Sequence, residues 1–408
     1  MSADRSSFLP YGRHCIDDDD VAAVASVLRG DWLTTGPTVE KFETAFAAKV
    51  GARYAVACCS GTAGLHLAAL ALGLGDGDQA IVPAMTFLAT ANATRYVGGE
   101  VTFCDVDPET GLMTPEALQE AMKGPAATPR AVFPVHLNGQ TADMPALSRI
   151  ARDRDMAVVE DACHAVGTTY LSDNEQIAVG SCRHSDMAVF SFHPVKTIAM
   201  GEGGMVTTND EDLYEKLRSF RNHGMTRAPE KFVNRELAFG HDGEPNPWYY
   251  EMLEPGFNYR ASDINCALGL SQLDKLSEFV ARRRELAARY ESLLAPLAPR
   301  VRPIERVANC TPAWHLFVVL IDFEAAAVDR ATVINRLKDR GIGTQVHYLP
   351  VYLQPYYRQR RGGYSLPGAE AYYAHCLSLP LFPGMENRDA DRVAGGLAAT
   401  LGLNYPKV

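Results

Sequence analysis

Short, uninterrupted apolar runs between residues 54 and 207 constrain the fold of this chain more than any other feature. A strand with one wet face alternates apolar and polar residues, whereas a strand buried on both faces, as in a parallel sheet, is apolar throughout. Helix-length segments separate several of the runs, as in repeated β-α-β units, so the sequence predicts an α/β domain with a mostly parallel sheet. The predicted strands are Tyr54–Cys58, Gln79–Val82, Val101–Cys104, Ala131–Val135, Ala157–Val159, Ala188–Phe192 and Gly204–Thr207, and the helices between them include Thr62–Leu74, Pro115–Met122 and Met144–Asp153.

The alternation ends near residue 210. A stretch rich in glycine, proline and aromatic residues follows, and then a long helical pattern from Ile264 to about Leu294. We therefore expect two domains, a large α/β domain at 1–260 and, at 261–408, the long linking helix with a small C-terminal α+β domain. The elements expected after the long helix are the strands His315–Ile321 and Gly343–Tyr348 and the helices Arg330–Arg340, Ala369–Cys376 and Asp389–Leu401.

Charge and cysteine content exclude several classes of function. Acidic residues number 49 and basic residues 39, and the net charge of −10 argues against nucleic acid or an anionic membrane as the main partner. The 9 cysteines lack the paired spacing of a zinc site, so we expect no metal and a reducing, cytoplasmic compartment. No apolar stretch approaches the roughly 18 residues of a membrane span, and the polar N-terminus does not resemble a signal peptide.

The segment Ser60–Ala63 follows the first predicted strand and opens a helix. Small residues there allow backbone N–H groups to approach an anion, and a helix N-terminus favours negative charge. A phosphate group would fit this segment. A plain helix cap formed by Ser60 or Thr62 would explain the same residues.

Two carboxylates, Glu160 and Asp161, end another buried strand, and His164 follows them. Open α/β sheets bind their ligands at the carboxyl ends of the strands. A buried acid at this point needs a partner. That partner is either a ligand or the start of a helix that the acid caps.

Lys196 differs from most lysines of the chain, which lie among charged residues. It follows the apolar Phe190–Phe192 and precedes the small-residue run Met200–Met205. Desolvation in such surroundings lowers the pKa of a lysine and suits it to imine chemistry, although a surface lysine lying along apolar surface is the alternative. A phosphate cradle, an acid for a protonated ring nitrogen and a desolvated lysine are together what pyridoxal phosphate requires.

These residues resemble the DegT/DnrJ/StrS family of nucleotide-sugar aminotransferases, which have the fold-type-I architecture of pyridoxal-phosphate enzymes. The likeness covers nearly the whole chain. Its motifs occur here as Trp32–Pro37, Ser60–Ala63, Glu160–His164, Ser191–Lys196, Gly201–Met205, His223–Met225, Gly256–Arg260 and Val346–Tyr348. Some members of the wider family dehydrate sugars and carry histidine at the lysine position, so Lys196 favours an aminotransferase.

The resemblance implies a role for each cofactor-binding residue. Lys196 would hold pyridoxal phosphate as an imine and then move protons, Asp161 would pair with the pyridine nitrogen, and His164 would lie near the ring hydroxyl. Phe87 would stack on the ring, with plain core packing as the alternative. The phosphate would be held by Gly61, Thr62, Ala63 and Ser191.

The resemblance also implies a homodimer with shared active sites, because Asn258 would reach the phosphate of the neighbouring subunit's cofactor. The residues expected near the sugar nucleotide are Thr34, Thr35, His193, His347 and Tyr348. His136, His223 and His315 are weighed as acid or base candidates, but a structural role is expected for His136 and His315, while His223 belongs to a family motif.

Within the family, Pro247–Met252, Gln345–Tyr352 and Leu377–Pro383 are similar to the branch that acts in pseudaminic acid biosynthesis. This implies transfer of the amino group of L-glutamate to the 4-position of UDP-4-keto-6-deoxy-N-acetyl-L-altrosamine, for decoration of flagellin or a surface glycan. The alternatives are another 4-aminotransferase of GDP-, dTDP- or UDP-linked keto sugars, of the perosamine or bacillosamine type, and a non-catalytic regulatory protein that binds the cofactor.

Overall fold

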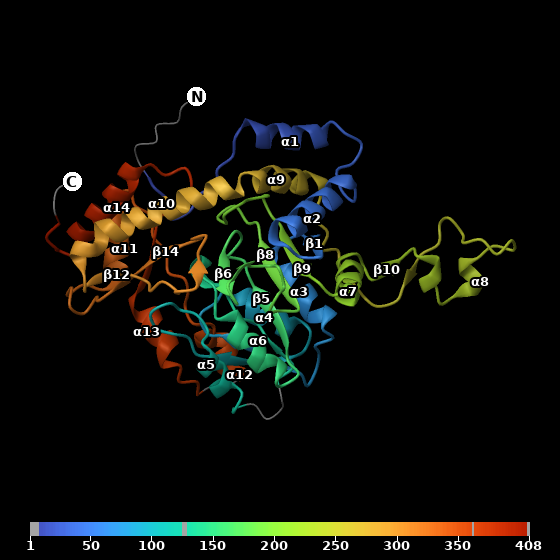
Figure 1. Cartoon of the computed structure of the whole chain (residues 1–408), viewed down its shortest axis with the longest axis horizontal. Coiled ribbons are helices and arrows are strands. Elements are labelled where there is room, and N and C mark those ends of the chain that lie inside the picture. The colour runs from blue at the N-terminus through green and yellow to red at the C-terminus, as the bar shows by residue number, and fades with distance from the viewer. Residues whose placement is uncertain (1–7, 125–128, 361–362, 406–408) are drawn as a thin grey trace.

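The computed structural model describes residues 8–124, 129–360 and 363–405 (Figure 1). None of the helices within these ranges is both long and apolar enough to cross a membrane. All 9 cysteines lie in the described ranges, and each is a free thiol.

A seven-stranded sheet forms the framework of the N-terminal part of the chain (Figure 1). Four of its strand pairs are parallel, and one strand, β9, runs antiparallel to both of its neighbours. Every strand predicted between residues 54 and 207 is present, and the mostly parallel sheet is confirmed. In spatial order the strands are β1 (Tyr54–Cys58), β9 (Gly204–Thr208), β8 (Met187–Ser191), β5 (Ala157–Asp161), β4 (Ala131–Val132), β2 (Gln79–Pro83) and β3 (Glu100–Cys104).

Helix α3 (Gly61–Ala71) connects the phosphate-cradle candidate to the sheet. It carries small or apolar residues on nearly every side, and such a helix is stable only when it is buried. It lies against β8 and β9, and Gly64 permits this close approach, because a Cβ there would stand 2.8 Å from Cγ1 of Val189. The other helices in contact with the sheet are α2 (Pro37–Val50), α4 (Leu88–Tyr96), α5 (Pro115–Ala121), α6 (Met144–Arg152) and α7 (Glu211–Arg221).

The long helix expected from Ile264 to Leu294 is two helices, α9 (Asp263–Asp274) and α10 (Leu276–Leu294), so that prediction is wrong. The division falls at Lys275, whose N–H bonds to the carbonyls of Gln272 and Leu273 in a tightened turn. The Lys275 ammonium pairs with Asp17 and lies 3.0 Å from Asp20, at the start of α1 (Asp18–Leu28). Since α1 packs on α9, this distant contact coincides with the break.

A three-stranded antiparallel sheet, β12-β14-β15, lies in the C-terminal part. The strand expected at Gly343–Tyr348 is absent, so that prediction is wrong. Its Gln345 forms a single bridge with Ser378, and Pro350, which has no N–H, follows soon after. The elements here are β12 (Val301–Pro303), β14 (Phe317–Ile321), β15 (Cys376–Leu379), α11 (Arg330–Asp339), α12 (Pro355–Arg360), α13 (Pro367–His375) and α14 (Asn387–Thr400).

The sheets change near the proposed domain boundary at residue 260, but the packing is continuous across it. Both hydrophobic clusters contain residues from before and after that position, for example Phe42 with Phe279, and Leu67 with Tyr290. A small sheet, β13-β6-β7, also joins the two parts, through β6 (Thr169–Ser172), β7 (Glu175–Ala178) and β13 (Cys310–Thr311).

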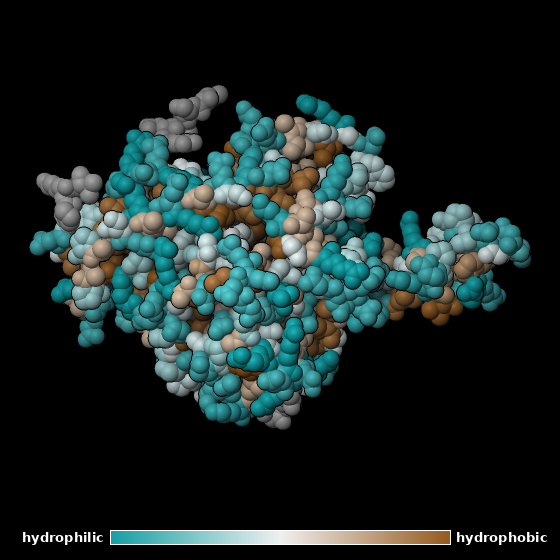
Figure 2. Space-filling model, in the orientation of Figure 1, coloured by the Kyte–Doolittle hydropathy of each residue, from teal (hydrophilic) through white to brown (hydrophobic). Residues whose placement is uncertain are grey.

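The stretch rich in glycine and aromatic residues forms a projecting segment, residues 225–252, which we call the arm (Figure 1). It begins with β10 (Met225–Thr226), includes α8 (Arg235–Ala238) and returns through β11 (Glu251–Met252). Phe232 packs on Phe239 and Tyr249 inside the arm, whereas Trp248 is exposed. Figure 2 shows apolar residues on the outside of this projection.

Candidate active site

A cavity of about 580 Å³ opens at the carboxyl ends of several sheet strands. Its walls include residues that follow β1 and β2, the last residues of β5 and β8, and the loop after β8. Parallel strands end at the same edge of a sheet, so the topology gathers segments that are far apart in sequence. The predicted residues that line this cavity are Gly61, Thr62, Phe87, Asp161, His164, Ser191, His193, Lys196, His347 and Tyr348.

The start of α3 forms one wall of the cavity. Ser60 is the helix cap, and its Oγ accepts the N–H of Ala63 at 3.1 Å. The capping alternative therefore applies to Ser60, and the Ala63 amide is already engaged. Gly61 allows the start of α3 to lie close to Ser191, because a Cβ there would lie 2.8 Å from the Cβ of Ser191. The helix N-terminus and the hydroxyls of Thr62 and Ser191 together form a cradle suited to an anion.

Asp161 ends β5 with its carboxylate held on two sides. Its Oδ2 accepts the hydroxyl of Thr90 at 2.6 Å, and its Oδ1 accepts the N–H of Cys163 at 3.2 Å. The side chain is buried, with 5% of the residue exposed, yet it lines the cavity. These bonds fix the carboxylate and leave lone pairs free for a protonated nitrogen of a ligand.

Lys196 lines the cavity from the loop after β8. Its N–H donates to the carbonyl of His193 at 2.8 Å, which forms a turn that directs the lysine into the cavity wall. Burial lowers the pKa of its ammonium, and the nearby Cys163 and Asp161 oppose that effect. At a given pH, the side-chain amine of Lys196 is therefore neutral in a larger fraction of molecules than the amine of a lysine in water.

His164 and Tyr348 form a hydrogen-bonded pair at the cavity wall. The Asn138 N–H donates to Nδ1 of His164 at 3.4 Å, and Nε2 of His164 lies 3.1 Å from the hydroxyl of Tyr348. Burial, together with the positive Lys196, holds the pKa of His164 well below its usual range. The ring is thus neutral, with its proton on Nε2, and donates to Tyr348, whose own hydroxyl hydrogen is free for another acceptor.

His347 lies beside this pair, with its Nδ1 2.8 Å from Oγ of Ser378. Burial, assisted by Lys196, lowers its pKa to about 3. His315, weighed above as structural, also lines the cavity, and its ring centroid lies 4.4 Å from that of His164. Burial holds the pKa of His315 well below its usual range as well.

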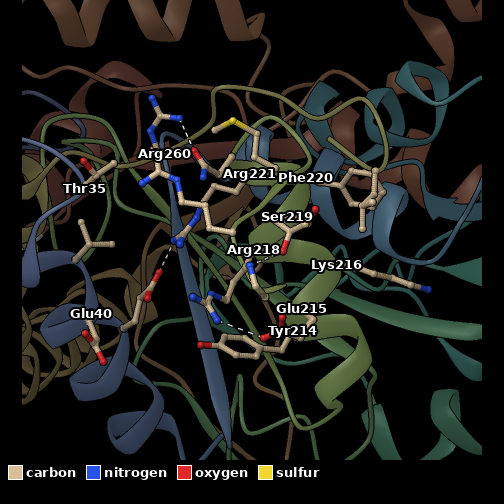
Figure 3. A pocket seen from close by; sticks show the side chains of 18 of the residues that line it. Thr35, Glu40, Tyr214, Glu215, Lys216, Arg218, Ser219, Phe220, Arg221 and Arg260 are labelled. Atoms are coloured by element: carbon tan, nitrogen blue, oxygen red, sulfur yellow. Dashed lines mark hydrogen bonds and ion pairs between the residues drawn. The ribbon is translucent and has the colours of Figure 1, made fainter. Parts of the chain in front are cut away.

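Four predicted site residues, Ala63, Thr34, Thr35 and Asn258, do not line this cavity. Ala63 is buried, and the other three are exposed. Thr35 lines a second cavity of about 770 Å³ at the base of the arm, where most labelled side chains are charged (Figure 3). Several of these charges pair within the chain, as in Arg221 with Glu43 and Arg218 with Glu215.

Sequence reasoning missed other residues of the cofactor-sized cavity. Tyr11 reaches it from the N-terminal segment, and Thr86 and Gln345 also line it. Thr90 does not line the cavity, but its hydroxyl donates a hydrogen bond to the Asp161 carboxylate. No motif marks Tyr11, Thr86 or Thr90, because they meet the site only through the tertiary fold, whereas Gln345 begins the Gln345–Tyr352 motif and was not assigned to the site. Within the described residues, no group of three or more His, Cys, Asp and Glu side chains could hold a metal ion.

A phosphate cradle beside a lysine of lowered pKa and a carboxylate facing the cavity is a donor set that fits pyridoxal phosphate. Together with the mostly parallel sheet, it defines a fold-type-I enzyme that depends on this cofactor. Comparison with known proteins agrees. The model of the DegT/DnrJ/EryC1/StrS aminotransferase family matches residues 14–398, and the chain belongs to that family. Its cofactor is pyridoxal phosphate.

Among curated proteins, the spore coat polysaccharide biosynthesis protein SpsC of Bacillus subtilis is 40% identical over 399 residues, which are 96% of this chain and 97% of SpsC. Among solved structures, Helicobacter pylori PseC, an aminotransferase involved in pseudaminic acid biosynthesis, matches with a TM-score of 0.86 and 27% identity, over 97% of this chain and 99% of PseC. The putative sugar aminotransferase Spr1654 of Streptococcus pneumoniae, in its pyridoxal-phosphate form, matches with a TM-score of 0.84 and 26% identity, over 97% and 99% of the two chains.

Proposed function

We propose that this aminotransferase moves the amino group of L-glutamate to the 4-keto carbon of a nucleotide-linked 4-keto-6-deoxy sugar. The observation that carries this proposal is the approach of Lys196, Asp161 and the start of α3 to one cavity. The substrate we favour is UDP-4-keto-6-deoxy-N-acetyl-L-altrosamine, with a role in pseudaminic acid biosynthesis. The similarity to PseC supports this choice, whereas the higher identity to SpsC favours a different polysaccharide sugar as the second candidate.

Pyridoxal phosphate, when bound, supplies an electron-accepting ring joined to the amino group that is transferred. Lys196 Nζ is the proton carrier in our proposal, because its lowered pKa leaves a larger share of it neutral than for a lysine in water. It would take a proton from the donor's α-carbon and return one to the acceptor's carbon. Asp161, fixed by its two hydrogen bonds, would hold a proton on the ring nitrogen throughout.

Other residues of the cavity lining are suited to orienting the reactants. Tyr348, kept as a donor by the neutral His164, can give its hydroxyl hydrogen to an oxygen of the cofactor or sugar. Burial raises the pKa of the Tyr348 phenol, so this donor stays protonated. Phe87, 53% exposed at the cavity mouth, would cover the face of the ring and exclude water.

Asn258 motivates a homodimer with shared sites. It is exposed and lies outside the cavity of its own chain, as do Thr34 and Thr35. We infer that these residues act in the cavity of a second copy, which would explain why residues of family motifs lie outside the cavity that Lys196 lines. This inference also accounts for the exposed apolar residues around them, such as Trp32 at 57%.

The substrate proposal is tested with purified holoenzyme, L-glutamate and a panel of 4-keto-6-deoxy sugars carrying UDP, GDP or dTDP. Formation of 2-oxoglutarate and of amino sugar is followed by mass spectrometry. We expect turnover with the UDP-linked N-acetyl-L-altrosamine derivative. Turnover with only a GDP- or dTDP-linked sugar would overturn the substrate choice and leave the reaction type in place.

Lys196→Ala tests the reaction type. We expect loss of turnover and of the visible absorbance, roughly 400–430 nm, of the cofactor linked to lysine. Retained turnover would refute the role of Lys196. A wild-type protein that binds the cofactor but forms no 2-oxoglutarate from glutamate would instead support the regulatory alternative.

Shared sites are tested by mixing two inactive variants, Lys196→Ala and Asn258→Ala, after unfolding and refolding together. A mixed dimer would contain one site with both defects and one site with neither. About a quarter of the sites in a random mixture should then be intact. Absence of any recovery, with mixed dimers verified by differential tags, would contradict the sharing of Asn258.

A further inference from the structure

Thr90 is a fully buried hydroxyl residue near the start of α4, and it contacts two parts of the cofactor cavity at once. Its Oγ1 lies 2.6 Å from Oδ2 of Asp161 and 3.3 Å from the carbonyl of Phe87. A second hydroxyl, that of Thr86, lies 2.7 Å from the same Oγ1. The Thr90 side chain therefore contacts both the Asp161 carboxylate and the backbone of Phe87.

The direction of these hydrogen bonds follows from the available protons. A threonine hydroxyl has a single hydrogen, and the Phe87 carbonyl and an ionised Asp161 can only accept. The short distance and the negative charge assign the Thr90 hydrogen to Asp161, since charge-assisted bonds are the stronger ones. The Thr86 hydroxyl must then donate to Thr90 Oγ1, which remains able to accept.

We propose that Thr90 is a positioning residue that sets the orientation of the Asp161 carboxylate toward the cofactor's ring nitrogen, with Thr86 supporting it. Without the Thr90 bond, the carboxylate loses its shortest hydrogen bond and keeps the longer contact from the Cys163 N–H. It would then rotate more freely in a buried place where an ionised group without partners is costly. This inference rests on the proposed pairing of Asp161 with the ring nitrogen.

Helix α4 provides a matched control, Thr94, one turn beyond Thr90. Thr94 is also fully buried, but its Oγ1 has no hydrogen-bond partner among the described residues. Thr94→Val therefore makes the same chemical change as Thr90→Val in the same helix without removing a hydrogen bond. Thr90→Ser keeps the hydroxyl and tests for rescue.

The experiment uses resting holoenzyme loaded with pyridoxal phosphate labelled with ¹⁵N in the ring, without donor or sugar. The ¹⁵N chemical shift reports protonation of the ring nitrogen, and a parallel titration of cofactor-free protein gives the dissociation constant. For Thr90→Val we expect a shift toward the unprotonated value and about tenfold or greater loss of affinity, as for a lost hydrogen bond to a charged group. Thr90→Ser and Thr94→Val should behave as the wild type.

Two results would overturn the proposal. One is a Thr90→Val protein with unchanged shift and affinity, and the other is a Thr94→Val protein that changes as much as Thr90→Val, which would indicate a general effect on α4. Asp161→Asn separates this proposal from the one on which it rests. If Asp161→Asn moves the signal and Thr90→Val does not, only the role of Thr90 fails. If Asp161→Asn moves nothing, the ring-nitrogen pairing fails and Thr90 loses its role with it.

Discussion

Replacing His347 with glutamine should make the protein less sensitive to acid. The ring of His347 is only 7% exposed and bonds to Ser378 through Nδ1. Burial and the nearby Lys196 lower its pKa from 6.5 to about 3. The folded protein therefore keeps this ring neutral in a pH range where the unfolded chain binds a proton.

The sign and the size of the change in the free energy of unfolding with pH follow from this difference in proton binding. Above the unfolded pKa of 6.5 neither state is protonated, so the full stability is present, and below it the unfolded state gains protons that the folded state does not. The loss grows by about 1.4 kcal/mol per pH unit until the folded pKa is reached. Between pH 7 and pH 5 the contribution of His347 is thus about 2 kcal/mol, a large part of a usual folding free energy.

The assay is urea unfolding of cofactor-free protein at pH 7 and pH 5, at one protein concentration, followed through the fluorescence of the buried Trp314. His347→Gln should lose about 2 kcal/mol less than the wild type between the two pH values. His164 and His315 remain in both proteins, and burial, the largest cause of their lowered pKa values, acts on them in both. His375→Gln, at an exposed position, is the control. An equal loss in wild type and His347→Gln would refute the reasoning.

Three further predictions concern the helix at the cradle, the aromatic at the cavity mouth and the lysine. Gly64→Ala should lower the free energy of unfolding by about 1–3 kcal/mol, because its Cβ would stand 2.8 Å from Val189, whereas Gly75→Ala should change it little in the same urea titration. Phe87→Ala should weaken cofactor binding by roughly three- to tenfold in a spectral titration but leave the unfolding midpoint of the cofactor-free protein unchanged, since its ring is half exposed. The rate at which cofactor-free protein attaches pyridoxal phosphate should level off below pH 10.5, because burial lowers the pKa of Lys196; a rise that continues beyond that pH in stopped-flow traces would contradict this.

The sheet was predictable from the sequence because burial on both faces leaves a local signature. Strands such as Tyr54–Cys58 are apolar at every position, and that pattern needs no knowledge of the partner strands. The convergence of Asp161 and Lys196 on one cavity could be predicted for a related reason. Strand ends in an α/β sheet meet at one edge, so two residues just beyond buried strands are neighbours wherever they occur in the chain.

Features that depend on distant contacts were not predictable. The break between α9 and α10 coincides with the pairing of Lys275 with Asp17, which is 258 residues away, and the local sequence contains no glycine or proline at that point. The segment Gly343–Tyr348 has a strand-like composition, but only one of its residues pairs with β15. The contact of Thr90 with Asp161 was not predictable either, because the sequence around a buried threonine in a helix does not indicate whether a carboxylate lies beside it.

The net charge of −10 has a consequence for how the anionic cofactor reaches its site. The cradle consists of helix N–H groups and two hydroxyls, which act at short range, and the cavity also contains Asp161 and Glu202. At long range the protein therefore repels the phosphate, and salt screens that repulsion over a Debye length of about 8–10 Å. The association rate of pyridoxal phosphate with cofactor-free protein should rise as salt is added to about 0.15 M, with little change in the dissociation rate, because the final contacts are buried. A stopped-flow association rate that falls with salt would instead show that a positively charged surface steers the cofactor, and the cradle would then need cations beyond Lys196.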